Sequence, residues 1–201
     1  MVKAAIVIPR ILLAALLVAA CSPAYADCRV VAPARAQVSF DVEQAGAPFR
    51  GSFKRFGGKV CLAGERVTQI DVWLDPASVD AGLPEIDAAL KGDDFFAVAL
   101  FPRATYSSES ISDKSGEQVA RGTLTMKGHS GPLDAPFRLQ HEGGDVVISG
   151  ALTLNRLDYG IGTGDWSNTK WLGAEVRVSF RATLAQAASG TSAEPPAANT
   201  R

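Results

Sequence analysis

Residues 156–166, RLDYGIGTGDW, combine titratable side chains with three alternating glycines, and glycine-rich turns can bind phosphate through their backbone N–H groups. A dinucleotide-binding fingerprint has the spacing G-x-G-x-x-G between a strand and a helix. Here the spacing is G-x-G-x-G, and no helical pattern follows it. We therefore expect these glycines to bend the chain where a strand ends, with Tyr159 and Trp166 either closing that end of the fold or lining its mouth.

Few other side chains have the spacing that catalysis or metal binding requires. His129 and His141 lie in polar, turn-like segments, and neither has a cysteine or carboxylate at ligand spacing. The G-x-S-x-G motif of a nucleophilic serine is absent from the sequence. The sequence therefore predicts no metal, no cofactor and no catalytic residues. Arg156, Asp158 and Tyr159 are the remaining candidates if the protein is an enzyme.

The first 26 residues have the features of a signal peptide. Lys3 and Arg10 precede an apolar run at residues 11–20, and the Ala-Tyr-Ala sequence at 24–26 supplies the small residues of a cleavage site. This pattern predicts export to the periplasm. The alternative is the lipoprotein-like sequence Val-Ala-Ala-Cys, which would make Cys21 a lipidated first residue.

The charge and cysteine content of the mature chain agree with export. Residues 1–26 contain two of the 20 basic residues and none of the 21 acidic residues, so 18 and 21 remain, a net charge of −3. This weak acidity argues against a nucleic-acid partner, because phosphates favour a basic surface. Cys28 and Cys61 are then the two remaining cysteines, and an even number in an oxidising compartment predicts a disulfide. Two unrelated buried thiols are the alternative.

The mature chain divides into one domain and a tail. Residues 186–201 consist of small, polar and proline residues without apolar periodicity, so we expect them to be disordered. Residues 27–185 have the length of one domain with one core.

The dominant pattern in this domain is a period-two alternation of apolar and polar residues, which is typical of strands with one buried face. Residues 84–92 instead carry helix signals, because Pro84 suits a first turn and Gly92 suits a helix end. The sequence therefore predicts an all-β fold of eight antiparallel strands, either a sandwich or a lipocalin-like barrel, with one short helical insertion. The predicted strands contain residues 38–42, 49–60, 70–74, 104–111, 124–126, 133–139, 146–154 and 176–180.

Small residues on the inward side of these strands favour a cavity over a solid core. They leave volume that a ligand can occupy. The alternative is that large neighbours fill the same volume and pack the barrel solid. The small inward residues are Gly51, Ala104, Ala135, Gly150 and Ala182.

Four stretches of the domain carry a resemblance to a known family: QAGAPFRGSFKRFGGKV at 44–60, VDAGLPEIDAALKGDDFFAVALFPRATYSS at 79–108, GTLTMKGHSGPLDAPFRL at 122–139 and RLDYGIGTGDW at 156–166. With them, most of the domain, from about residue 38 to 184, resembles the YceI-like family of exported lipid-binding proteins. The resemblance implies an extended lipocalin-like barrel, a long polyisoprenoid in its apolar interior, a periplasmic location and no catalytic residues. The branch that this chain resembles most occurs near membrane b-type cytochromes, which implies a quinone-linked role. Many members have a histidine where this chain has Gln44.

The residues expected to contact the lipid are large inward side chains and aromatic residues at the mouth. Ordinary core packing is the alternative for each of them. The expected contacts are Phe40, Val42, Phe53, Val72, Leu74, Tyr106, Leu124, Phe137, Ile148, Leu152 and Phe180 in the interior, and Phe95, Phe96, Tyr159 and Trp166 at the mouth.

The leading hypothesis from the sequence is an exported carrier of a long isoprenoid lipid such as a prenyl quinone. One alternative is an interaction module with a solid barrel and a membrane b-type cytochrome as partner. Another is an enzyme that acts on a quinone or lipid head group through Arg156, Asp158 or Tyr159. In a binding protein, these three residues would form either an inward-facing polar cluster that meets the lipid head group or a structural network that holds the barrel end closed. The sequence predicts no oligomeric state.

Overall fold

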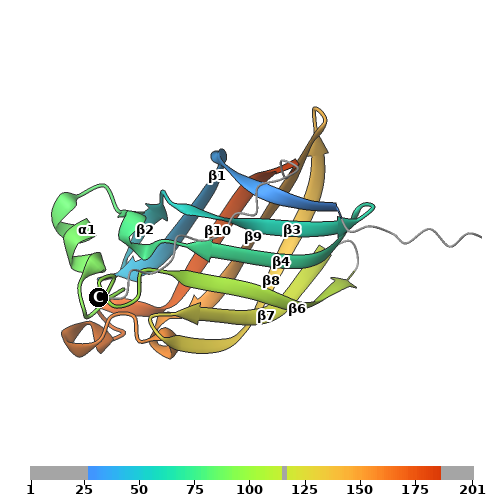
Figure 1. Ribbon diagram of the computed structural model, residues 1–201. Coiled ribbons are helices and arrows are strands. Elements are labelled where there is room, and N and C mark those ends of the chain that lie inside the picture. The colour runs from blue at the N-terminus through green and yellow to red at the C-terminus, as the bar shows by residue number, and fades with distance from the viewer. Residues whose placement is uncertain (1–26, 115–116, 187–201) are drawn as a thin grey trace, which may run out of the picture.

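The computed structural model describes residues 27–114 and 117–186, which form strands and one short α-helix around a single interior (Figure 1). The predicted signal peptide, Cys21 and most of the predicted tail lie outside the described residues. The strands are β1 (Asp27–Gln44), β2 (Ala47–Phe53), β3 (Phe56–Ala63), β4 (Arg66–Leu74), β5 (Val79–Asp80), β6 (Ala104–Lys114), β7 (Glu117–Met126), β8 (His129–Glu142), β9 (Asp145–Asn155) and β10 (Leu172–Gln186).

The strands form one antiparallel sheet that closes on itself, because β10 pairs with β1. The order around the barrel is β1, β3, β4, β6, β7, β8, β9, β10. β2 and β3 pair one after the other with β1, so they act as one bent strand that is interrupted at residues 54–55. The two-residue β5 pairs with β2. The predicted all-β, eight-stranded barrel is therefore confirmed, and the single strand predicted at 49–60 corresponds to β2 and β3 together.

The predicted helical insertion is helix α1 (Pro84–Lys91), with Gly92 as its C-cap residue. Pro84 occupies the first turn, where its missing N–H is not needed, and Glu85 and Asp87 lie near the positive end of the helix dipole. No helix in the described part of the chain combines the length and hydropathy needed to cross a bilayer. Figure 1 shows α1 at one end of the barrel, which we call the helix end. The described residues also include short 3-10 helices: η1 (Pro76–Ser78) after β4, and η2 (Arg156–Tyr159) and η3 (Gly164–Ser167) between β9 and β10.

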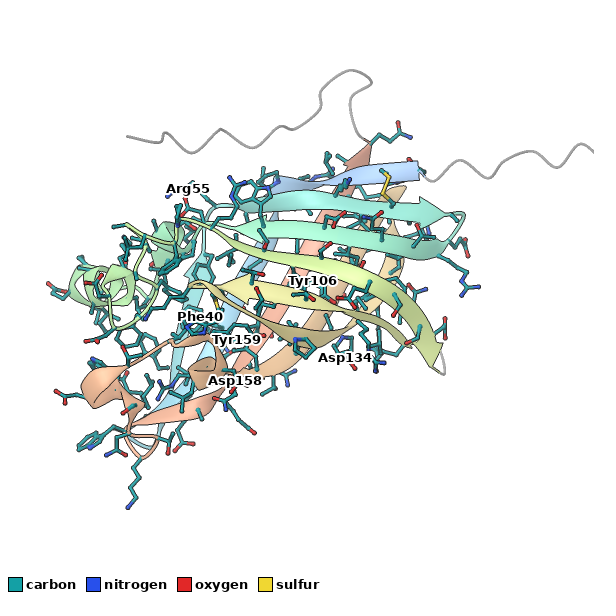
Figure 2. The ribbon with its side chains drawn as sticks, turned by 60° about the horizontal axis from the view of Figure 1, so that its bottom comes forward. Phe40, Arg55, Tyr106, Asp134, Asp158 and Tyr159 are labelled. Atoms are coloured by element: carbon teal, nitrogen blue, oxygen red, sulfur yellow. A yellow bond between two sulfur atoms is a disulfide. The ribbon has the colours of Figure 1, made fainter. Side chains whose placement is uncertain are left out.

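The opposite end of the barrel, the disulfide end, contains the bond between Cys28 and Cys61 (Figure 2). These cysteines are directly opposite each other in the register of β1 with β3. The predicted disulfide is thus confirmed, and it closes a loop across a sequence separation of 33 residues. In the chain-entropy model, a loop of this length stabilises the fold by roughly 3–4 kcal/mol.

The glycine-rich segment at 156–166 connects β9 to β10 at the helix end. It is an irregular connection built from η2 and η3 rather than a tight hairpin. Gly160, Gly162 and Gly164 have φ angles of 63°, 73° and 59°. This left-handed conformation is costly for residues with a Cβ atom, so the glycines are the points at which the chain bends.

Candidate ligand-binding cavity

The middle of the barrel encloses an apolar cavity of about 300 Å³. Side chains that point inward from the surrounding strands, such as Val72, Leu124 and Leu152, are only half-buried. In a close-packed core these positions would be fully buried. Their remaining exposure therefore marks an interior space that the side chains do not fill.

Close packing ends the cavity at the disulfide end. Phe137 and Leu184 are 1% and 2% exposed, and Ala120 is 0% exposed. Tyr106 forms part of the cavity wall above them, and its hydroxyl donates to the carbonyl oxygen of Ala120 at 2.9 Å, with the Leu133 carbonyl oxygen at 3.3 Å. Burial raises the pKa of Tyr106 to about 12, with smaller contributions from nearby carboxylates. The phenol is therefore a neutral donor to the backbone, and its ring is what faces the cavity.

A cap made of two chain segments, residues 83–101 and 156–171, closes the helix end. Leu90, Phe95 and Phe96 come from the first segment, Ile161 comes from the second, and all four are buried against the cavity. The N–H groups of residues 162 and 163 donate to the carbonyl oxygen of Asp94 at 2.7 and 2.9 Å. These bonds hold the two segments to each other.

Lys127, in the turn between β7 and β8, adds a second connection within the cap. Its ammonium group donates to the carbonyl oxygens of Asp93 and Gly160, each at 2.7 Å. Burial lowers the pKa of Lys127, and the nearby Asp94 and Asp93 partly oppose this effect. One side chain thus bonds to both segments of the cap.

Arg156 organises the second segment of the cap from inside. It is 2% exposed, and burial lowers the pKa of its guanidinium. Its five N–H groups all donate to main-chain carbonyl oxygens, so none remains for a ligand. The acceptors and distances are Ile161 at 2.7 Å, Gly162 at 2.8 Å, Trp166 at 2.7 Å, Leu172 at 2.8 Å and Gly173 at 2.9 Å.

The structure brings most of the predicted contact residues together around this cavity. Two predicted mouth residues do not line it: Tyr159 is buried in the cap, and Trp166 packs on the ring of Phe95 with centroids 5.3 Å apart. Ligand contact by any predicted residue stays a prediction. Those in the cavity wall are Phe40, Val42, Phe53, Val72, Leu74, Phe95, Phe96, Tyr106, Leu124, Phe137, Ile148, Leu152 and Phe180.

The small inward residues have two different roles. Aromatic rings fill the space at the glycines: Phe40 covers Gly51, and a Cβ atom at Gly150 would lie 2.6 Å from the ring of Phe180. The alanines at 104, 135 and 182 instead form part of the cavity wall. Ring packing therefore explains the glycines, and the open space lies against the alanines.

The residues considered for catalysis have different environments. Tyr159 is buried at the helix end, whereas its neighbour Asp158 is exposed (Figure 2). Burial raises the pKa of Tyr159, with a smaller contribution from Asp158. Within residues 27–114 and 117–186, no group of three or more His, Cys, Asp or Glu side chains could hold a metal ion. What this arrangement can do chemically is enclose an apolar chain.

Sequence reasoning missed five residues that also line the cavity although they alternate with the inward side chains. Period-two alternation assigns such residues to the solvent side. Two local signals in the sequence were available: Pro33 lies in the irregular part of β1, and the Phe-Gly-Gly sequence at 56–58 begins β3. The five residues of this kind are Gln37, Gly57, Trp73, Thr105 and Arg181.

The closed antiparallel barrel and its apolar cavity define the class of the protein, a lipocalin-like barrel with an internal cavity. The chain belongs to the YceI-like domain family, whose pattern matches residues 30–184. A UPF0312 protein of Shewanella oneidensis is 30% identical over 138 residues, which cover 64% of this chain and 72% of that protein.

Solved structures have the same fold. BcnA of Burkholderia cenocepacia is 27% identical with a TM-score of 0.73, over 76% of this chain and 98% of that one. A polyisoprenoid-binding domain from Saccharophagus degradans, implicated in plant cell wall breakdown, is 17% identical with a TM-score of 0.64. That match covers 81% of this chain and 100% of the other, and at this identity it shows the fold alone.

Proposed function

We propose that this protein is a periplasmic binding or carrier protein for a long isoprenoid lipid, with a prenyl quinone as the favoured ligand. The observation that carries the proposal is the cavity, which is walled by aliphatic and aromatic side chains. The cavity wall has a polar group toward each end, the Tyr106 hydroxyl and the Arg156 guanidinium. Both are already hydrogen-bonded to the backbone. Membership of the YceI-like family and the polyisoprenoid-binding relative of the same fold support the same ligand class.

Burial of an isoprenoid chain supplies enough free energy for binding without a polar site. At about 0.8 kcal/mol per buried CH₂, one five-carbon unit contributes roughly 3–4 kcal/mol before entropic costs. A cavity of about 300 Å³ lies at the lower end of the usual range for small-molecule sites. The cavity therefore suits a few isoprene units, and the rest of a longer chain extends out of it.

The periplasmic location rests on residues 1–26 and on the disulfide, which forms in oxidising compartments. Mass spectrometry of the protein from fractionated host cells tests it. A periplasmic product that begins at Asp27 supports the proposal, and a lipidated product that begins at Cys21 shows a membrane-anchored form.

A pair of neighbouring substitutions on β10 tests ligand binding in the cavity. Val178 lines the cavity, whereas Ser179 is on the other face of the strand. Val178→Trp fills space that two or more methylene groups would occupy, so we expect affinity for a prenyl quinone to fall at least about tenfold. Ser179→Trp is the matched control and retains affinity.

Native mass spectrometry of the protein from its host, followed by organic extraction, measures the bound lipid directly. Repeated recovery of empty protein that also fails to take up prenyl quinones would refute the proposal. Stable capture of a membrane cytochrome by lipid-free protein would instead favour an interaction module. The use of all five Arg156 donors by main-chain carbonyls supports binding rather than turnover.

A further inference from the structure

The pairing between β1 and its neighbour is interrupted in the middle of the barrel. β1 pairs with β3 as far as Val30 opposite Lys59, and with β2 only from Val38 opposite Phe53. Residues 31–37 and 54–58 thus face each other without a strand ladder, and we call this interruption the seam. Figure 1 shows the sharp bend of β1 in this part of the barrel.

The chain on the far side of the seam turns toward η1 instead of toward β1. The N–H of Lys54 donates to the carbonyl oxygen of Ser78 at 3.1 Å, and the N–H of Asp75 donates to that of Arg55 at 2.9 Å. The N–H of Arg55 donates to the Ser78 hydroxyl at 2.9 Å. These backbone groups of residues 54 and 55 are therefore bonded on the side of η1, and the ladder between β1 and β2 or β3 is absent at this point.

The cavity reaches the surface of the barrel at the seam. Its wall includes five strand residues that alternate with the inward side chains, and they lie in register on the two sides of the seam. Gly57, Trp73 and Thr105 are successive cross-strand neighbours on β3, β4 and β6. Gln37 and Arg181 are opposite each other on β1 and β10. Packing at the disulfide end and the cap at the helix end leave the seam as the side on which outward-facing residues line the cavity.

Residues in and beside the seam add polar groups and an indole ring to an otherwise mainly apolar cavity wall. The guanidinium of Arg103 lies 4.8 Å from the centre of the Trp73 ring, a cation–π arrangement. Gly57 has no side chain, and a Cβ atom there would lie 3.0 Å from the Trp73 indole, so the indole packs on the backbone of β3. Gln37 is exposed and carries an amide that can donate or accept. A ring with carbonyl groups suits this surface.

We propose that the seam is a lateral portal through which the isoprenoid tail enters the barrel, that Gln37 lies at the edge of this portal, and that the head group is held outside it by Trp73 and Arg103. This inference rests on the proposed function. It places the head group on the side of the barrel and away from the cap. In the cap, all donors of Arg156 are already used by main-chain carbonyls.

The three tryptophans of the chain allow the head group to be located directly. A Trp166→Phe/Trp171→Phe variant retains only Trp73 at the seam, and a Trp73→Phe/Trp171→Phe variant retains only Trp166 at the cap. The probe is a ubiquinone with two isoprene units, because a quinone ring quenches indole fluorescence at contact, and geranylgeraniol is the control without a quinone. We expect the quinone to quench Trp73 and to leave Trp166 unchanged, and geranylgeraniol to quench neither.

A second pair of variants tests passage through the seam. Gln37→Trp adds a bulky side chain at the portal, and Ser39→Trp adds the same side chain two residues further along β1, outside the cavity wall. We expect Gln37→Trp to slow both uptake and release of the quinone by roughly tenfold with little change in the dissociation constant, as for a gate. Ser39→Trp should match the unmodified protein.

Native mass spectrometry of the same samples separates the two levels of the proposal. If no variant and no unmodified protein binds either prenyl probe, the proposed function fails and the portal with it. If the quinone is bound but quenches Trp166, or neither tryptophan, the head group is not at the seam. If Gln37→Trp exchanges quinone as fast as Ser39→Trp, the tail does not pass through the seam. Either of the last two results overturns the portal alone.

Discussion

Replacement of Arg156 by methionine tests whether this buried guanidinium is a structural element of the cap. Methionine has a long apolar side chain but donates no hydrogen bond, so the substitution removes all five bonds to main-chain carbonyls. Three of these bonds, to Ile161, Gly162 and Leu172, are buried. The other two acceptors, Trp166 and Gly173, are in part-buried bonds and can be solvated by water.

The expected loss follows from the three buried acceptors. A buried polar group without its partner costs about 1–3 kcal/mol. Partial relaxation of the loop and the removal of a buried charge offset part of this cost, so we expect Arg156→Met to lower the free energy of unfolding by about 3–5 kcal/mol. Arg156→Lys keeps a charge but has only three donors. Its decrease in the free energy of unfolding should therefore lie between zero and that of Arg156→Met.

Urea denaturation followed by circular dichroism measures the change. The control is Arg121→Met on β7, because Arg121 forms an exposed ion pair with Asp134, and such pairs contribute only about 0–1 kcal/mol. A loss below about 1 kcal/mol for Arg156→Met would show that the carbonyls find other partners and would refute the structural role. In the folded protein, Arg156→Lys should bind prenyl quinone as tightly as the unmodified protein, since no Arg156 donor is free for a ligand.

Three further predictions concern the rest of the barrel. Replacement of Cys28 and Cys61 by alanine should lower the free energy of unfolding by roughly 3–4 kcal/mol, and an unchanged urea midpoint would contradict this expectation. The pKa of Tyr106, about 12, lies above its unfolded value of about 10, so the stability it contributes is fully present below pH 10 and is lost as the pH rises through 12. Tyr106→Phe should therefore lose less stability than the unmodified protein between pH 9 and about 11.5, and parallel losses would exclude this cause. Gly162→Ala should destabilise the fold by about 2–3 kcal/mol more than Gly64→Ala, measured by urea denaturation, because both have positive φ but only Gly162 has a side chain, that of Arg156, in the path of the new Cβ. Equal losses for the two glycines would show that the guanidinium moves aside freely.

The sequence was a good guide to the barrel because its signals are local. Inward residues such as Val38, Phe40 and Val42 recur with period two, and this period holds for any strand with one buried face. The helix was predicted equally well, because Pro84 and Gly92 favour a helix start and a helix end through local backbone preferences. The disulfide followed from the number of cysteines in a chain predicted to be exported, without knowledge of the register that places Cys28 opposite Cys61.

The candidate site was harder to predict from the sequence, because each of its main features depends on residues far apart in the chain. The sequence left the role of Arg156 undecided, because one of the carbonyl groups that it bonds, that of Gly173, lies 17 residues further along the chain. Tyr159 and Trp166 have the composition of mouth residues, yet the packing of the cap places them outside the cavity wall. Small inward residues looked alike in sequence, whereas the structure fills the glycine positions with rings and leaves space at the alanines.

The sequence by itself determined which residues face inward, where the helix lies and which cysteines remain to pair, because alternation, helix signals and composition act over short distances along the chain. Only the tertiary structure decided where the interior is empty and where it opens. The cavity depends on how side chains from all the barrel strands meet, and the seam depends on Lys54, Arg55 and Asp75 bonding around η1 instead of completing the ladder with β1. Alternation placed Trp73 and Gln37 on the outside of their strands, whereas in the structure both line the cavity, Gln37 within the interruption of β1 and Trp73 opposite Gly57.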